Sequence, residues 1–166
     1  MQIRIDGTSK FISLIQKFHN EFKNKILKKS PKYSKLESIV FQVVQTSKLD
    51  VAGRASFANS RISINACLTH NNPSRLYEIY GHELAHCYST LFHNKNINHG
   101  KEWVEVMRLI DLKPTTELTL NPSEISFMDS HLASCNCLVN NQKIIHRKEV
   151  KSFSVCNMCY SKYIIR

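Results

Sequence analysis

The segment His82-Glu83-Leu84-Ala85-His86 constrains this chain more than any other feature of its sequence. Residues four apart on a helix lie one above the other on the same face, so His82 and His86 would converge on one point. Glu83 would then stand beside a water held at that point. Two imidazoles and a carboxylate at this spacing are typical of helix-borne zinc sites in metalloproteases. The alternative is an amphipathic helix with two incidental histidines.

A catalytic zinc usually has three protein ligands and one open position, so a third ligand is expected. The metzincin pattern would need Gly at position 89 and His at position 92, but Ser89 and Phe92 stand there. His93 lies about 10 Å beyond His86 on a continuing helix and could ligate only if the helix ended early. Both patterns are therefore disfavoured.

His99 is the predicted third ligand. Asn94-Lys95-Asn96 should break the helix and let the chain turn back, and Gly100 permits a close approach beside His99. Glu102 or Glu105 is the alternative third ligand. Three further histidines have no partner at metal-ligand spacing and are predicted to be surface or structural residues: His19, His70 and His131.

Glu83 is the predicted general base, which would take a proton from water and return it to the leaving amine. The alternative is a carboxylate that only supports a ligand or forms an ion pair. Four residues are candidates for stabilising the oxyanion, and the sequence does not distinguish them: Arg54, Tyr80, Tyr88 and His93.

Apolar spacing predicts three helices, over residues 8–29, 74–92 and 99–112. Thr8 or Ser9 can cap the first, and Asn72-Pro73 is a start signal for the second. Three strands are predicted over 38–44, 54–58 and 61–65, the last two joined by a tight turn at Asn59-Ser60. Gly53 should mark a bulge or a close backbone approach.

Two cysteine pairs, eighteen residues apart, predict a zinc ribbon in the tail: Cys135, Cys137, Cys156 and Cys159. Four thiolates make a closed structural zinc site, and metal binding would stabilise a segment too short to fold alone. Because one residue rather than two separates the first pair, His131 or His146 could replace Cys135 or Cys137. Free thiols or a labile disulfide are the other alternative.

The chain carries a net charge of +10, and the excess is concentrated near its start. Residues 1–50 hold ten Lys or Arg and four Asp or Glu. Such a surface attracts polyanions, and the tentative nucleic-acid contacts are Lys25, Lys28, Lys29 and Lys32. The alternative is a solvated lysine face without a partner. With no apolar run long enough to cross a membrane and no signal-peptide pattern, we expect a cytoplasmic protein, monomeric and without a membrane partner.

Several segments, taken in order, resemble the SprT family, which includes Spartan-like eukaryotic proteins. They are Ala52-Gly53-Arg54-Ala55 with Ile62-Ser63-Ile64-Asn65, the motif at 82–86, His99-Gly100-Lys101-Glu102-Trp103, and the four tail cysteines with His146-Arg147-Lys148 between them. The family commonly has Gly where Asp111 and Leu112 stand. Leu138 and Tyr160 replace the Gly that usually follows a ribbon cysteine.

The resemblance implies an α+β fold: a zincin-like metalloprotease domain over residues 1–125 and a zinc ribbon over 126–166. The expected domain has an N-terminal helix, a small antiparallel sheet, an active-site helix and a second ligand helix. The resemblance makes His82, His86 and His99 the ligands of a catalytic zinc, Glu83 the base, and the four tail cysteines the ligands of a structural zinc.

In Spartan-like relatives the substrate is protein bound or crosslinked to DNA, and DNA stimulates cleavage. We therefore expect a zinc-dependent protease acting on DNA-bound or DNA-crosslinked proteins, with DNA, single-stranded DNA included, as a partner. One alternative is a zinc-containing DNA-binding regulatory protein with weak or no protease activity. The other is a zinc hydrolase acting on a substrate that is not a peptide.

Overall fold

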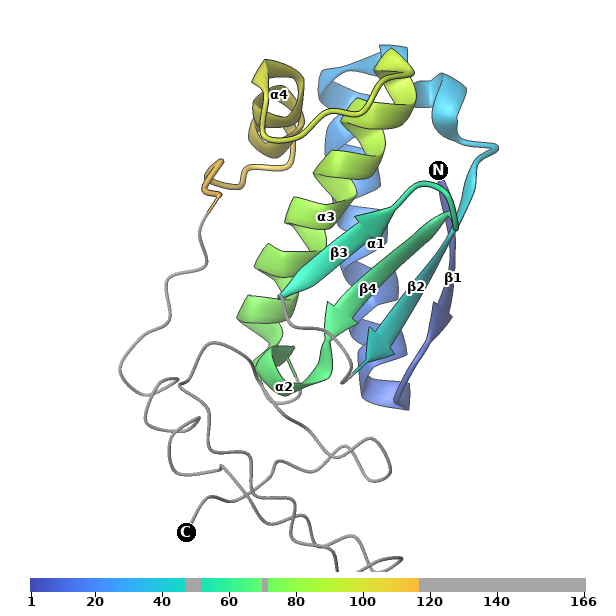
Figure 1. Cartoon of the computed structure of the whole chain (residues 1–166), viewed down its shortest axis with the longest axis vertical. Helices are drawn as coiled ribbons and strands as arrows, with labels where there is room; N and C mark the ends of the chain where they lie inside the picture. Colours follow the sequence, from blue (N-terminus) through green and yellow to red (C-terminus); the bar gives the residue numbers. More distant parts are fainter. Residues whose placement is uncertain (47–51, 70–71, 117–166) are drawn as a thin grey trace, which may run out of the picture.

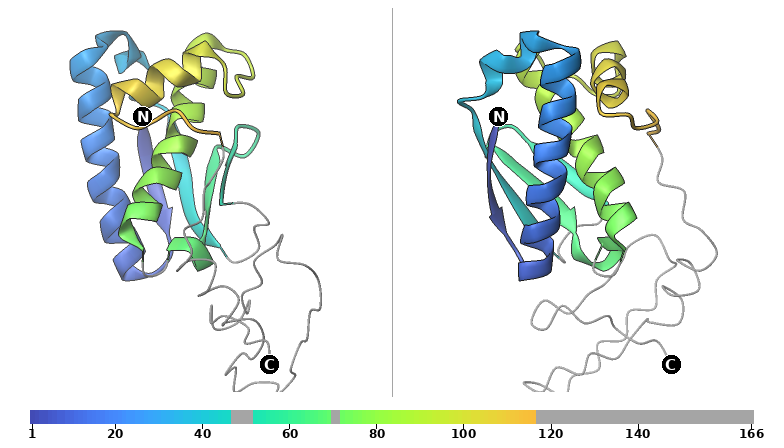
Figure 2. Two further views of the ribbon diagram at one scale, coloured as in Figure 1. Left: turned by 90° about the vertical axis from the view of Figure 1, so that its left-hand side faces the viewer. Right: turned by 180° about the vertical axis from the view of Figure 1, so that it is seen from behind.

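Two long helices, α1 (Ser9–Lys29) and α3 (Pro73–His93), lie against one face of a four-stranded sheet (Figures 1 and 2). This is a computed structural model, and it describes residues 1–46, 52–69 and 72–116. The mixed α+β class expected from the sequence is confirmed for this part. The predicted ribbon, with its four cysteines and the alternatives His131 and His146, lies outside the described residues, as does the domain boundary at 125.

The sheet contains β1 (Gln2–Asp6), β2 (Val40–Thr46), β3 (Gly53–Ser56) and β4 (Arg61–Asn65), in the order β1-β2-β4-β3. β1 pairs in parallel with β2, and β2 in parallel with β4. Only β3 and β4 form an antiparallel pair among these strands. The prediction of an antiparallel sheet is therefore wrong for two of the three pairs. The chain passes through α1 between β1 and β2, and such a crossover returns it in the same direction.

Helix α1 begins and ends where the sequence predicts. The Thr8 hydroxyl accepts a hydrogen bond from the Phe11 amide at 3.3 Å, which caps the first turn. Its apolar stripe packs into the core that α1 shares with α3 and the sheet; the buried apolar members are Phe11, Ile15, Phe18, Phe22 and Ile26. A short 3-10 helix, η1 (Pro31–Leu36), follows and leads the chain into β2.

Helix α3 carries the His82–His86 segment and is also capped as predicted. The Asn72 side chain accepts from the Arg75 amide at 3.1 Å, and Pro73 occupies the first helical position. The helix ends at His93 and is capped by Asn94, which has a left-handed backbone with φ of 50°. A short turn, α2 (Ala66–Thr69), precedes it, and α4 (Lys101–Leu109) follows it and packs against it. None of the helices in the described ranges has the length and apolar character needed to span a membrane.

Candidate metal centre

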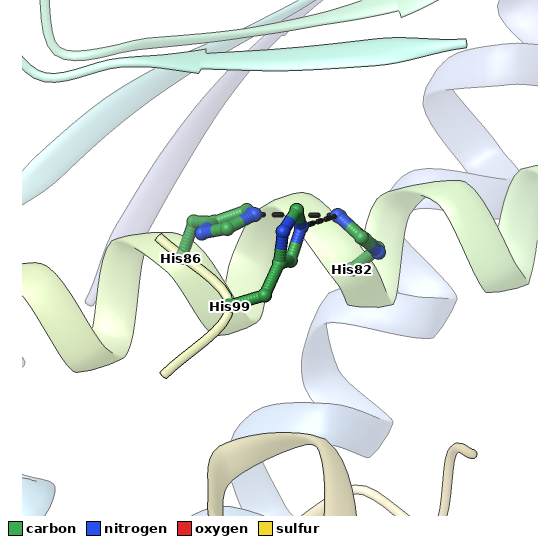
Figure 3. A group of neighbouring side chains, drawn as sticks. All are labelled: His82, His86 and His99. Atoms are coloured by element: carbon green, nitrogen blue, oxygen red, sulfur yellow. Dashed lines mark hydrogen bonds between the residues drawn. The ribbon is translucent and has the colours of Figure 1, made fainter. Parts of the chain in front are cut away.

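Three histidine side chains meet beside α3. His82 and His86 project from α3, and His99 comes from the segment just before α4 (Figure 3). The Nε2 atoms of His86 and His99 lie 3.2 and 3.1 Å from Nε2 of His82. All three rings are half-buried, and one nitrogen of each lies within 4.8 Å of the others. We call these residues the His triad; they could hold a metal ion.

The spacing of the triad fits a zinc ion. Two zinc–nitrogen bonds of about 2.0–2.1 Å at a tetrahedral angle place their nitrogens about 3.3–3.4 Å apart. The observed separations of 3.1 and 3.2 Å are close to that value. Three nitrogen ligands at one point leave a fourth position of a tetrahedral site open, as in catalytic zinc sites.

A hydrogen bond fixes the tautomer of His86. Its Nδ1 lies 3.3 Å from the carbonyl oxygen of Ile97, and a carbonyl can only accept. Nδ1 therefore carries the proton, and the Nε2 lone pair faces the triad. His82 has a comparable backbone hydrogen bond with Thr115. Partners of this kind orient metal-binding histidines in proteins.

The connection between α3 and α4 returns to α3 through Ile97. Its amide donates to the Thr90 hydroxyl at 3.3 Å while its carbonyl accepts from His86, and its side chain is buried. These bonds bring His99 to the other two ligands. Helix α3 continues to His93, so the condition under which His93 could ligate is not met.

Trp103 forms the floor of the triad. Its indole Nε1 donates to the His82 carbonyl at 3.3 Å, and its ring centroid lies 4.8, 5.6 and 4.7 Å from those of His82, His86 and His99. The side chain is fully buried. Packing against all three rings, Trp103 restricts their rotation and excludes water from beneath them.

Glu83 lies on the next position of α3, buried between the helix and β3 with 7% of its surface exposed. Burial raises the pKa of Glu83 to about 7, while the backbone N–H of Ala55 and the positive charge of Arg54 act in the lowering direction. The carboxyl group can therefore exchange a proton near neutral pH.

Burial has the opposite effect on His82 and His86, because their charged form is the protonated one. Desolvation is the largest cause lowering each pKa to about 4, and the neighbouring imidazoles add to it. Both rings are therefore neutral at physiological pH, which is the state that binds a metal.

The structure separates the alternatives that the sequence left open. Glu102 pairs with Lys95 at 3.3 Å and Glu105 with Lys32 at 2.7 Å, so neither carboxylate joins the triad. Among the oxyanion candidates, Arg54 is the one whose charge acts on Glu83. The others are engaged or enclosed elsewhere: the Tyr80 hydroxyl lies 2.7 Å from His19, Tyr88 is fully buried, and His93 has a buried Nε2.

The predicted DNA-binding lysines lie on α1 and η1, and acidic groups meet most of them. Lys25 contacts Glu21 at 2.8 Å and Asp111 at 3.5 Å, and Lys29 also contacts Asp111. Lys32 is the partner of Glu105. Lys28 is exposed and forms no ion pair with any residue in the described ranges. The lysine face is thus partly neutralised within the fold.

His19 is structural, one of the two roles that the sequence predicts for it. It is buried, its Nδ1 lies 2.7 Å from the Tyr80 hydroxyl and its Nε2 lies 3.1 Å from the Met1 carbonyl. The carbonyl accepts, so Nε2 carries the proton and Nδ1 accepts from Tyr80.

Sequence reasoning missed the roles of Thr90, Ile97 and Trp103 in shaping the site. Trp103 is named from the sequence only as part of the segment 99–103 that resembles the family, with no expected contact with the ligands. Its place four residues after His99, on the helix that follows the third ligand, is the signal that could have suggested a contact with the triad.

Comparison with known proteins agrees with this geometry. The SprT-like family model matches residues 12–122, a stretch that includes most of α1, the His triad, Glu83 and α4. A search of curated proteins and a search of solved structures each returned no significant match. The family resemblance read from the motifs is confirmed by a match that covers well over half of the chain, and the chain belongs to the SprT-like family.

Proposed function

We propose that this protein is a zinc-dependent endopeptidase that cleaves DNA-bound or DNA-crosslinked proteins and is stimulated by DNA. Membership of the SprT-like family indicates a function of the metalloprotease type, and the His triad could bind a metal. The observation that carries the proposal is the convergence of three imidazole nitrogens next to the buried carboxylate of Glu83. A site that only bound metal would have no need of that carboxylate.

His82, His86 and His99 would hold the metal. When bound, zinc supplies a Lewis acid that polarises the scissile carbonyl and makes water more acidic. Glu83 takes a proton from the attacking water and delivers it to the leaving amine. Arg54 is the oxyanion candidate whose positive charge acts on Glu83.

The position of β3 supports a peptide substrate. β3 is an edge strand, so one of its sides has no strand partner in the sheet. In an antiparallel pair, alternate residues direct their backbone groups toward the partner and away from it. The Ala55 amide binds Glu83, so Ala55 and Gly53 direct theirs to the open side. An extended peptide pairing with this edge would lie beside Glu83.

We further propose the domain arrangement expected from the sequence, with the catalytic domain over 1–125 and a zinc ribbon over 126–166. The ribbon would bind a second, structural zinc through Cys135, Cys137, Cys156 and Cys159. Metal analysis should then find two zinc ions per chain. Changing Cys156 and Cys159 to Ser should remove one, and changing His82 and His86 to Ala should remove the other. Retention of both ions in either variant would contradict the corresponding site.

The test of function is cleavage of a DNA-binding protein, with and without single-stranded DNA, by the wild type and by Glu83→Gln. Gln keeps the size of the side chain but cannot take the proton. We expect zinc content to be unchanged and cleavage to fall by at least about a hundredfold. DNA binding without cleavage in either protein would favour the regulatory alternative. If the protein cleaves the same substrate equally well with and without DNA, the proposed protease activity stands and the proposed stimulation by DNA is contradicted.

A further inference from the structure

One face of the sheet is left open by the helices. In the described ranges, α1 and α3 both pack on the face that carries Ile3, Phe41, Val43, Ile62 and Ile64 (Figures 1 and 2). Because side chains alternate along a strand, their neighbours point to the other face. Three of those neighbours, Arg4, Gln42 and Arg61, are polar or charged and exposed, whereas Val44 on the same face is buried outside the core that the helices share with the sheet.

Four residues form one complete row across this open face. Arg4 is level with Gln42, Gln42 with Arg61, and Arg61 with Ser56. Arg4, Gln42 and Arg61 are exposed, and Ser56 is half-buried. Strands lie about 4.8 Å apart, so the two arginine Cα atoms are about 10 Å apart with a polar amide between them. We call this set the arginine row.

The arginines of the row differ in availability from those α1 lysines that have a carboxylate partner; Lys28, which has none in the described ranges, is as available as they are. Lys23, Lys25 and Lys29 all meet carboxylates, at Glu37, Glu21 and Asp111. Arg4 and Arg61 make no ion pair or hydrogen bond with any residue between 1 and 116 that the structure describes. The row contains no acid; the nearest one on the open face of β1 is Asp6, two residues along from Arg4.

We propose that the arginine row binds the phosphate backbone of a nucleic acid. A guanidinium offers a planar fork of donors that matches a phosphate, and Gln42 and Ser56 add neutral hydrogen-bonding groups beside it. The row has no aromatic side chain on which a base could stack, so recognition would be through phosphates and independent of sequence. The overall charge of +10 favours the same class of partner.

The row ends at β3, the strand whose other side borders Glu83. A nucleic acid on the open face would therefore lie next to the edge at which the proposed peptide substrate pairs. This assignment rests on the nucleic-acid part of the proposed function and names the surface that serves it.

The test is binding of a fluorescein-labelled single-stranded DNA oligonucleotide to the full chain, measured by anisotropy over a range of salt concentrations. The test variant is Arg4→Gln with Arg61→Gln. The matched control is Lys23→Gln with Lys29→Gln, which removes the same charge from α1 lysines that meet carboxylates. Loss of two phosphate contacts should weaken binding by on the order of tenfold at about 0.1 M salt and lower the salt slope by about 1.4. The lysine variant should change affinity by less than about threefold. Zinc content and urea midpoint of both variants show that they are folded.

Wild-type affinity retained in the arginine variant, or equal weakening in both variants, would overturn the arginine row as the binding surface. Either result would leave the proposed protease and its DNA partner in place. No binding by the wild type at low salt would overturn the row and the nucleic-acid part of the proposed function together. The comparison of wild type with Glu83→Gln would still test the proposed peptidase activity independently of DNA binding.

Discussion

The backbone of Gly53 in β3 lies directly against the carboxylate of Glu83 in α3. A Cβ built on Gly53 would lie 2.8 Å from both Cγ and Oε1 of Glu83, and equally close to Cγ2 of Ile79. Real Cβ atoms essentially never approach so closely. The sequence offered a bulge or a close backbone approach at this glycine, and the structure shows the close approach. Any side chain here must displace the proposed base.

Gly53→Ala should therefore impair catalysis more than folding. The added methyl group would push the Glu83 carboxylate away from the Ala55 amide, and a shift of about 1 Å in a catalytic group can reduce the rate on the order of a hundredfold. The measurement is the cleavage rate with zinc content determined in parallel. Ser63→Ala, on the neighbouring strand β4 level with Arg54 and outside the arginine row, is the control. Full activity in Gly53→Ala would show that Glu83 does not act from the position observed.

Trp103→Phe should weaken zinc binding. The variant loses the donor to the His82 carbonyl and part of the surface that packs on all three rings. Supporting residues of this kind are worth about 10- to 100-fold in metal affinity. Competition with a chelator measures the change. Met107→Leu, a buried substitution of similar volume in the same helix, should leave affinity within about threefold. Equal affinities in wild type and Trp103→Phe would show that the indole does not support the ligands.

The buried imidazole of His19 should make the fold less stable in acid. Burial lowers the pKa of His19 to about 4 from its ordinary value of about 6.5. Between these values the unfolded chain binds more protons, so the free energy of unfolding falls as pH falls, by up to about 3 kcal/mol. His19→Gln cannot titrate and should lack this part of the pH dependence. Urea unfolding with a chelator present measures both proteins, and effects of His82 and His86 cancel in their difference. Parallel pH profiles would show that His19 is not held neutral.

Asp111 occupies a backbone position that favours glycine. Its φ is 61°, and it follows the end of α4 in a Schellman motif, with the Leu112 amide donating to the Met107 carbonyl at 2.9 Å and the Asp111 amide to that of Arg108 at 3.2 Å. Asp111→Gly should be more stable than Asp111→Asn by about 1 kcal/mol, since both lack the charge and only glycine is unstrained. Urea unfolding measures the difference; equal stabilities would contradict the left-handed assignment.

Local patterns predicted much of the fold and of the site. The apolar stripe of α1, the caps at Thr8 and Asn72, and the break at Asn94 each depend on residues close in sequence. The segment 82–86 and the return of the chain at His99 depend on helical period and a helix break, which are also local. These features could therefore be read without knowing which elements pack together.

The rest depended on contacts between distant residues. β1 and β2 are parallel because the chain runs through α1 between them. β2 and β4 are parallel because the chain runs back through β3 between them. Neither pairing can be read from a single strand. β1 was missed although Ile3 and Ile5 alternate with polar residues. Some of the carboxylates that meet the lysines of α1 and η1 are distant in sequence, as Asp111 beside Lys29 and Glu105 beside Lys32 show. Charge counted along the sequence therefore does not tell which cations are paired within the fold.

The third histidine also has a mechanical consequence. A metal held by the triad would tie α3 to the segment entering α4, fastening a nine-residue helix that is shorter than the about 12–15 residues an isolated helix needs in water. Without that tie, α4 depends on its own packing through Trp103, Val106 and Met107. Chelation should therefore loosen α4 before α1 or β2, and its amide hydrogens should be the first to gain faster exchange. The ion proposed for catalysis would then also hold α4 against α3. Loss of the metal would release α4 before the rest of the protein unfolds.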